Sequence, residues 1–389
     1  MSSENNQHDG SGSYSRRSYL RYGAGGLAVG LAGCAGNGGG NSDGSDDGSD
    51  GGDGSDGGDG GTDGSDGGDG ESGGETGDVR WRAGTPGEGS STFAIANGLS
   101  RILDEQESSI DLEVASYSGS NEAIRLVGRG EDEMAGSALP LAAAANRDEE
   151  PVPDGPADFT GDNALEYKPV QALNFLDFRM YWITLEGNDI ETVDDFEGRD
   201  IGVFQRGAAF NNLTLLSVTD MLDKVNEQYV EFNEIASALD TGRIDATGFY
   251  AGQGTVPAGW QTQLINDDRV QIVTWSDEQL DQIGDSGYAT PAPVQVNDIF
   301  EKDLPMETVM GNAIPYGFFP RENLSEERVY QFTKTLLDNA DQIAEFSAEV
   351  EHFTTQYAAE SLSPGMPVHS GVARYLKEED LWNDNLTEA

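Results

Sequence analysis

The chain has 389 residues and a formal net charge of −49, because 71 acidic side chains face only 22 basic ones. An acidic excess of this size excludes nucleic acid as a partner, since phosphates need a basic surface. The same acidic excess destabilises a compact fold at low ionic strength, because like charges repel one another. Since the acidic residues are spread along the whole chain, they predict a salt-adapted surface rather than a site for cationic partners.

Residues 1–33 have the pattern of a targeting peptide. Arg16-Arg17 followed by Ser-Tyr-Leu resembles a twin-arginine export signal. The weakly apolar run at 23–33 is about half the ~20 residues that a membrane-spanning helix needs. Leu-Ala-Gly before Cys34 resembles a lipobox, so this single cysteine is predicted to carry a lipid and to become the new N-terminus. The alternative is an unprocessed tail with a chance cysteine.

Residues 34–78 are predicted to be a disordered tether. From residue 37 onward this stretch is nearly all Gly, Asp and Ser, with 13 acidic residues and no Lys or Arg. Such a composition offers no apolar side chains to offset the entropy of ordering, and like charges extend it. Calcium-binding repeats are the alternative, but the apolar position of their nonapeptide pattern is missing.

Residues 79–389 are long enough for two medium lobes. A strand is predicted at 79–83, followed by a Gly-rich loop at 84–91. Apolar residues at helical spacing predict a helix over 92–103, and alternation predicts a strand over 110–115. Together these elements form a βαβ unit.

The same order of predicted elements occurs twice in the chain. Stretches 121–136 and 235–250 each predict a short helix, a glycine stop, an acidic turn and a small-residue strand. Before the second stretch, a Gly-containing loop at 201–207 leads into a predicted helix over 208–222. The repetition predicts two α/β lobes with helix N-termini facing a hinged cleft, and helices within 327–353 are predicted to brace the first lobe.

Five motifs in this order resemble those of the TAXI family of solute-binding proteins, which serve TRAP-type secondary transporters. They are Gly84-Thr-Pro-Gly-Glu-Gly89, Gly119–Leu126, Val193–Val203, Asp240–Ala246 and Pro367–Tyr375. The last is similar to the closing His-Pro-Gly-Ala-x-x-Tyr signature of the family. The resemblance covers nearly all of the chain after the tether.

The resemblance implies an α/β fold of periplasmic-binding-protein type II, with two Rossmann-like lobes, a ligand cleft between them and two hinge crossovers. Residues 79–182 and 300–389 are predicted to form lobe 1, and residues 183–299 to form lobe 2. The implied function is capture of a small organic solute, a carboxylate or an amino acid, and its delivery to a TRAP-type permease. The implied protein is a monomer, exported and held by its lipid at the outer face of the cytoplasmic membrane.

Two alternatives stay open: an exported hydrolase, and a ligand-sensing lipoprotein of the same fold. Gly-Asp-Ser286-Gly is similar to a serine-protease fragment, but no histidine stands in a suitable context for a triad. His8, His352 and His369 do not form a zinc pattern. We therefore predict no catalytic residue, no metal and no cofactor, and a structural hydrogen bond near a helix start for His369.

The solute is expected at the Gly-rich loops and helix N-termini, which can hold a carboxylate without a metal. The second loop lacks two hydroxyl donors of the family and reads Gly207-Ala-Ala-Phe210, so a less acidic or partly apolar solute is possible. Arg206 either pairs with a carboxylate or faces solvent. The predicted ligand-binding residues are Gly84, Thr85, Gly87, Ser90, Ser91, Phe93, Ser137, Gln205, Arg206, Gly207, Ala208, Phe210 and Tyr250.

Overall fold

The structure, a computed structural model, describes residues 77–152, 157–300, 302 and 304–389. The predicted export signal, the lipid site at Cys34 and all but the last two residues of the predicted tether lie outside this range. None of the helices in the described ranges combines the length and the hydropathy that a membrane crossing requires.

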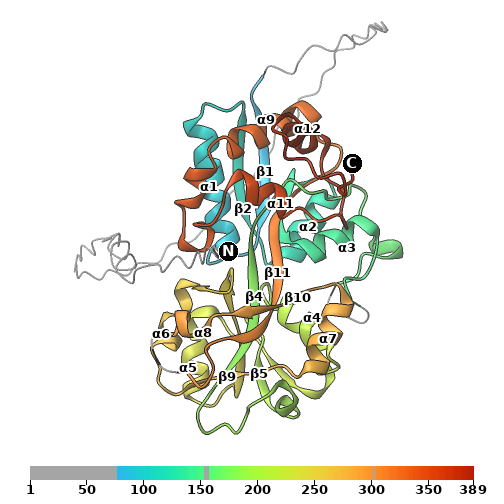
Figure 1. The fold of residues 1–389 in the computed structure, drawn as a ribbon. Coiled ribbons are helices and arrows are strands. Elements are labelled where there is room, and N and C mark those ends of the chain that lie inside the picture. The colour runs from blue at the N-terminus through green and yellow to red at the C-terminus, as the bar shows by residue number, and fades with distance from the viewer. Residues whose placement is uncertain (1–76, 153–156, 301, 303) are drawn as a thin grey trace, which may run out of the picture. The chain divides into compact units, whose positions relative to one another are not determined.

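A mixed sheet of 11 strands runs through the described residues (Figure 1). Its main order is β2-β1-β3-β11-β4-β7-β5-β6, with β10 beside β11, β9 beside β4 and β8 beside β7. The strands are β1 (Val79–Thr85), β2 (Ile110–Ser116), β3 (Met134–Ala138), β4 (Leu173–Leu185), β5 (Asp200–Gly202), β6 (Asn226–Gln228), β7 (Ala246–Gly252), β8 (Val256–Pro257), β9 (Val270–Val273), β10 (Thr290–Val294) and β11 (Val309–Pro320).

Two long antiparallel strands, β4 and β11, join the two halves of the sheet (Figure 1). The first half contains the parallel strands β1, β2 and β3, and β3 pairs with the end of β11 at 316–320. The second half contains the parallel strands β5, β6 and β7, and β7 pairs with the end of β4 at 178–184. The predicted lobe boundary at 182 and 183 falls inside β4, and the lobe boundaries themselves stay a prediction.

Helices cover both halves of the sheet (Figure 1). The first half carries α1 (Ser91–Glu105), α2 (Ser120–Gly128), α3 (Leu139–Arg147), α9 (Glu326–Leu337), α10 (Ala340–Ala344), α11 (Thr355–Glu360) and α12 (Ser370–Glu378). The second half carries α4 (Phe210–Val218), α5 (Ile235–Asp240), α6 (Thr262–Ile265), α7 (Asp277–Ser286) and α8 (Val296–Ile299). Both α9 and α10 contact α1, which confirms the helices predicted within 327–353.

The predicted βαβ unit is confirmed by the parallel pairing of β1 and β2 around α1. Ile95, Leu99 and Ile102 of α1 are buried at helical spacing, so one apolar face of the helix drives its packing. The helix predicted over 208–222 is shorter than expected. It ends at Val218, because Asp220 has a φ of 55°, which a right-handed helix cannot continue.

His369 has the structural role predicted for it. It is the N-cap of α12, and its Nδ1 accepts a hydrogen bond of 3.1 Å from the backbone N–H of Gly371. The imidazole is 1% exposed, and burial lowers the pKa of His369 from 6.5 to about 4.

The depressed pKa of His369 predicts an acid-dependent loss of stability. In the unfolded chain His369 takes up a proton near its ordinary pKa of 6.5, whereas the folded protein resists protonation until about pH 4. The contribution is therefore complete above pH 6.5 and is lost as the pH falls from there to about 4, at an upper limit of about 3 kcal/mol. His369→Asn keeps a capping acceptor but does not titrate. The difference in unfolding free energy between wild type and this variant, measured in urea, should shrink as the pH falls from 7 to 4; a constant difference would contradict the prediction.

Candidate functional site: a pocket between the two halves of the sheet

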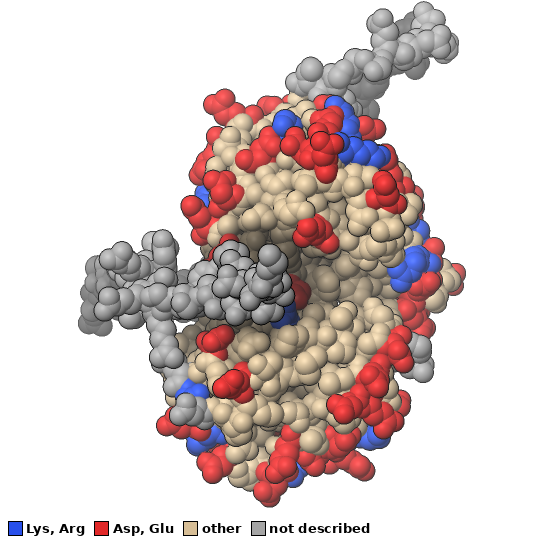
Figure 2. Space-filling model, viewed as in Figure 1, with Lys and Arg blue, Asp and Glu red and all other residues tan. Residues whose placement is uncertain are grey.

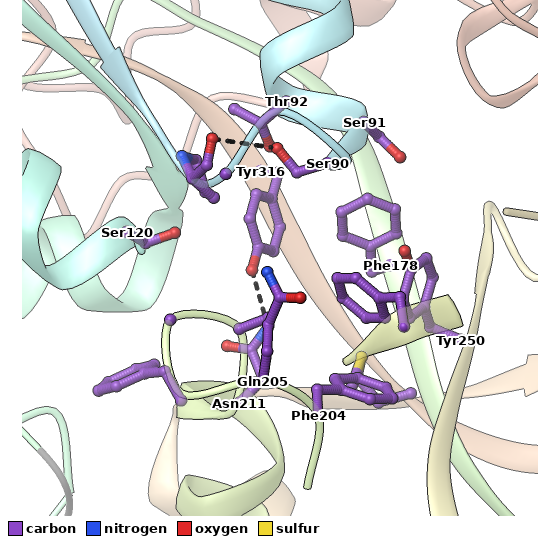
Figure 3. Close-up of a pocket in the computed structure, with 17 residues that line it drawn as sticks. Ser90, Ser91, Thr92, Ser120, Phe178, Phe204, Gln205, Asn211, Tyr250 and Tyr316 are labelled. Atoms are coloured by element: carbon purple, nitrogen blue, oxygen red, sulfur yellow. Dashed lines mark hydrogen bonds between the residues drawn. The ribbon is translucent and has the colours of Figure 1, made fainter. Parts of the chain in front are cut away.

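A pocket lies where the N-termini of α1, α2 and α4 meet the middle of β4 and β11 (Figure 3). The visible face of the molecule is hollowed between the two halves, and acidic side chains are scattered around it (Figure 2). The cavity has a volume of about 70 Å³, room for roughly five to seven water molecules. It is lined by Pro86, Gly87, Ser90, Ser91, Thr92, Ser120, Phe178, Met180, Phe204, Gln205, Gly207, Ala208, Phe210, Asn211, Phe232, Tyr250 and Tyr316.

One side of the pocket is polar and is built from helix starts. Ser90 is the N-cap of α1, where its hydroxyl accepts a hydrogen bond of 3.2 Å from the Phe93 N–H. Ser91, Ser120 and Asn211 lie in the first turns of α1, α2 and α4. Each of these N-termini presents unpaired N–H groups and the positive end of a helix dipole. The polar side is therefore suited to an anionic or strongly accepting group.

Aromatic rings form another part of the pocket wall (Figure 3). The ring centroid of Phe178 lies 4.7 Å from that of Tyr250 and 4.8 Å from that of Tyr316. Phe204 and Phe232 continue the wall, with their centroids 5.2 Å apart. None of the lining residues carries a formal charge. The pocket therefore offers an apolar surface for the body of a solute and helix ends for its polar group.

Phe204 holds this wall in an uncommon backbone conformation. Its φ is 71°, in the left-handed region, although its side chain is bulky. A large residue in this region costs of order 1–3 kcal/mol and is held there by its surroundings. The ring is 2% exposed and packs against Phe232, Tyr250 and Trp260. The aromatic contacts and the strained backbone occur together at the pocket.

A chain of hydrogen bonds fixes the hydroxyl of Tyr316. Tyr288 donates from its hydroxyl to Oδ1 of Asn211 at 2.6 Å, and Nδ2 of Asn211 donates to the Tyr316 hydroxyl oxygen at 2.8 Å (Figure 3). Because the Tyr316 oxygen already accepts from Asn211, its own hydrogen can be donated to Ser120 or to a solute. Burial raises the pKa of Tyr316 to about 12, and hydrogen bonds with Asn211 and Ser120 partly offset this. Tyr316 is thus a neutral donor at physiological pH.

Tyr316→Phe is expected to weaken solute binding by about tenfold, because the donor is lost and Asn211 Nδ2 is left without its acceptor. Calorimetric titration measures the change. Tyr330→Phe is the control, since the Tyr330 hydroxyl donates to Glu378 on the outer helices, at 2.6 Å. Equal affinities of wild type and Tyr316→Phe would show that the solute does not use this hydroxyl.

The structure brings eight of the predicted ligand-binding residues to the pocket. They are Gly87, Ser90, Ser91, Gln205, Gly207, Ala208, Phe210 and Tyr250. The predicted residues that do not line it are Gly84, Thr85, Phe93, Ser137 and Arg206. Thr85 and Ser137 are fully buried, and their hydroxyls bond to backbone carbonyls of neighbouring residues. Phe93 contributes its backbone N–H to the Ser90 cap rather than its ring to the pocket.

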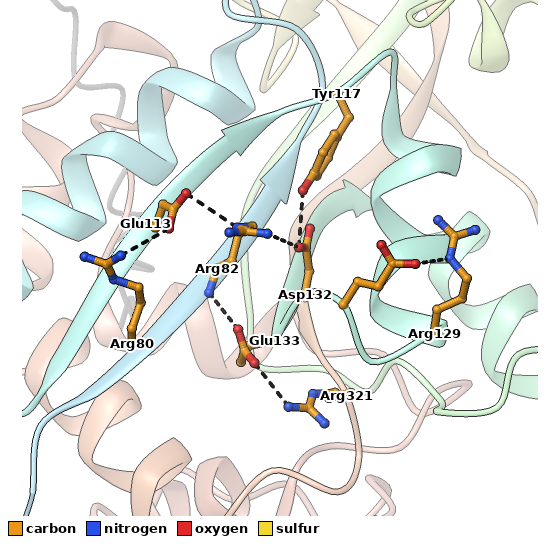
Figure 4. Close-up of polar contacts among 9 residues, drawn as sticks. Arg80, Arg82, Glu113, Tyr117, Arg129, Asp132, Glu133 and Arg321 are labelled. Carbon is orange, nitrogen blue, oxygen red and sulfur yellow. Dashed lines mark hydrogen bonds and ion pairs between the residues drawn. The ribbon is translucent and has the colours of Figure 1, made fainter. Parts of the chain in front are cut away.

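Gly84 has a packing role instead. A Cβ at this position would lie 2.7 Å from Oδ2 of Asp132 and 2.8 Å from the ring of Tyr117. Asp132 is fully buried there, accepts from the Tyr117 hydroxyl at 3.2 Å and lies 3.8 Å from Arg82 (Figure 4). Burial raises the pKa of Asp132, while Tyr117 and Arg82 lower it. The glycine leaves room for a buried polar cluster behind the first loop.

Arg206 faces solvent, which was one of its two predicted positions. Its guanidinium lies 4.4 Å from the ring centroid of Tyr229. It borders a second, shallow hollow together with Arg125 and Arg129 of α2. Arg206 therefore does not supply a positive charge to the pocket.

Several lining residues could not be predicted as such. Phe178 and Tyr316 come from the middle of β4 and β11, where the sequence shows only strand-like apolar runs. Asn211 and Ser120 follow helix starts that were recognised, and their place in the first helical turn is the signal that could have identified them. Phe204 lies within the Gly-containing loop at 201–207 and was not among the predicted ligand-binding residues.

These features define an α/β protein with a solute-sized pocket between two halves of one sheet, and the structure confirms the predicted α/β class. The model of the NMT1-like family matches residues 83–379, so the chain belongs to the NMT1-like family. No curated protein matches the chain.

The chain is similar, at low identity, to several solved structures. The substrate-binding protein of an amino acid ABC transporter is 13% identical, with a TM-score of 0.39 over 70% of this chain and 99% of that one. A putative L-cystine ABC transporter protein from Listeria monocytogenes is 12% identical, with a TM-score of 0.41 over 70% and 95%. The alkanesulfonate-binding protein SsuA from Xanthomonas axonopodis pv. citri, bound to MOPS, is 12% identical, with a TM-score of 0.38 over 80% and 96%.

Proposed function

We propose that the chain is an exported solute receptor that captures a small organic solute, a carboxylate or an amino acid, and delivers it to a TRAP-type secondary transporter. The observation that supports this most directly is the pocket itself. Three helix N-termini and the Tyr316 hydroxyl face an uncharged, aromatic-walled cavity between two halves of a sheet. Such a site binds by hydrogen bonds and burial, and its two sides can close on a solute.

The similar structures and the predicted export signal support a role in transport at the membrane. Two of the similar structures reported above are named for ABC transporters, and the TRAP partner rests on the resemblance of the five sequence motifs. Export and anchoring rest on the predicted twin-arginine signal and on Cys34. In this proposal the lipid holds the receptor at the outer face of the cytoplasmic membrane.

The hydrolase alternative would need a nucleophile and a base in contact. Ser286 lies at the end of α7, where its hydroxyl donates to the Ile283 carbonyl at 2.6 Å. His352 bonds to Gln253 at 2.9 Å and His369 caps α12. These three side chains are engaged in local structure, and none of them lines the pocket.

Calorimetric titration of the full chain in molar KCl tests the receptor proposal. The panel contains amino acids, dicarboxylates, branched 2-oxo acids and short carboxylates. One-to-one binding with the solute recovered unchanged is expected. Conversion of a bound compound would favour the hydrolase, and no binding by a well-folded protein would overturn the receptor proposal.

A further inference from the structure

A carboxylate from the C-terminal part of the chain lies at the start of α1, beside the pocket. Glu349 belongs to the short 3-10 turn Ala348–Val350. Its Oε1 accepts a hydrogen bond of 2.9 Å from Oγ of Ser91. Ser91 is the first residue of α1 and lines the pocket. The positive end of α1 therefore already has a carboxyl group of the protein itself beside it.

The charge of Glu349 also reaches the aromatic wall of the pocket. Burial raises the pKa of Tyr250 above its ordinary range, and the next cause is the charge of Glu349. The Ser91 and Tyr250 hydroxyls lie on the same side of the pocket (Figure 3). The stem of Glu349 packs against the end of β7, where its Cβ would lie 3.4 Å from a Cβ added at Gly252. Glu349 thus stands behind one wall, between the two halves.

The carboxyl has spare capacity to accept a hydrogen bond. Within the described residues, Ser91 is its one hydrogen-bond donor, and Oε2 accepts none. Burial raises the pKa of Glu349, and the bond from Ser91 partly offsets this. Among the described residues, no cationic side chain forms an ion pair with this carboxyl group.

Other charged and titratable groups near this turn are engaged elsewhere. On β4, Nε of Arg179 pairs with Asp177 at 3.2 Å. His352 is bonded to Gln253, and Tyr250 accepts from Nε1 of Trp260 at 3.1 Å. None of these groups forms an ion pair or hydrogen bond with Glu349 in the described part of the chain. A cation that neutralises Glu349 would have to come from the solute.

We infer that Glu349 selects solutes that carry an ammonium group at the end facing α1, and that it disfavours solutes with a carboxylate there. The carboxylate of such a solute would then lie toward the starts of α2 and α4, near Ser120 and Asn211. The solute class is an amino acid or a similar small zwitterion rather than a simple carboxylate. This inference rests on the proposed receptor function and narrows it.

Matched pairs of compounds that differ in the amino group test the inference: L-valine and isovalerate, L-alanine and propionate, L-glutamate and glutarate. Each is titrated calorimetrically into the full chain in molar KCl at pH 7.5, with wild type, Glu349→Gln and Glu351→Gln. Glu351 is the matched control, because it is two residues away and exposed. Wild type should prefer the amino compound of at least one pair. Glu349→Gln should weaken that compound by about tenfold and bring its deaminated partner closer in affinity, whereas Glu351→Gln should change neither.

The pH dependence of binding is a second test of the inference. Lowering the pH through the raised pKa of Glu349 protonates this side chain and removes its negative charge. The affinity for the amino compound should then fall. The affinity for its deaminated partner should rise relative to that of the amino compound. Glu349→Gln corrects for titration of the solutes. A wild-type preference for the deaminated partners, or binding that does not change in Glu349→Gln, would overturn the inference while leaving the receptor proposal intact. Failure of every compound to bind would count against the receptor proposal itself.

Discussion

Gly207→Ala is expected to lower solute affinity by at least about a hundredfold, or about 2.7 kcal/mol. A Cβ at Gly207, before α4, would lie 1.0 Å from the carbonyl oxygen of Ser118, before α2. The reverse contact is also too close for a side chain, because a Cβ at Gly119 would lie 2.0 Å from the carbonyl oxygen of Gly207. Both obstructions are backbone atoms, so a rotamer change cannot relieve them. The two loops would have to separate, and the helix starts on the two sides of the pocket would move apart with them.

Calorimetric titration measures the affinity, and small-angle scattering with and without solute measures the separation of the two halves. Gly89→Ala is the control, because it also lies in a Gly-rich loop but its added Cβ meets no atom within 4 Å. We expect Gly89→Ala to bind as wild type does. Normal binding and normal compaction in Gly207→Ala would show that this close contact is not needed for the solute-bound state.

Phe204→Ala is expected to lower the free energy of unfolding by about 3–5 kcal/mol, because a buried ring is lost from the aromatic wall. Phe204→Gly should be more stable than Phe204→Ala by about 1 kcal/mol, since glycine adopts the φ of 71° without steric cost. This order is the reverse of the usual one, in which alanine is the more stable replacement. Urea unfolding of the three proteins measures both differences.

Phe232 provides the comparison for Phe204. Its ring is part of the same wall, but its backbone is not in the left-handed region. Phe232→Gly should therefore be less stable than Phe232→Ala. If glycine is also the less stable replacement at position 204, the backbone strain at that residue does not contribute to stability.

Local sequence patterns were sufficient to predict the pocket residues that lie at the starts of α1 and α4. The strand at 79–85, its Gly-rich loop and the amphipathic helix α1 follow from neighbouring residues, so Ser90 and Ser91 could be placed at a helix start. The same holds for Gly207 and Phe210 at the start of α4. These predictions rest on spacing and capping, which are properties of short segments.

The remaining parts of the site depend on pairing between distant segments. Tyr316 reaches the pocket because β11 lies between β3 and β4, and this order is not encoded in the spacing of its residues. Glu349 was read only as part of a helical stretch, although it bonds to a residue 258 positions earlier. For Arg206, the sequence predicted its position in the loop before α4 correctly. The sequence did not determine whether its side chain points into the pocket or into solvent.

The place of β11 in the sheet has a consequence for how the molecule is made. Strands β3 and β4 are neighbours in the sequence but lie on either side of β11, which begins at Val309. Until that strand has been synthesised, the facing edges of β3 and β4 lack their partner, and the pocket lacks Tyr316. Such distant pairings slow folding and leave strand edges open to aggregation. Most of the chain must therefore leave the ribosome before β11 can pair with β3 and β4. Until then, the incomplete sheet has to stay soluble with these strand edges unpaired.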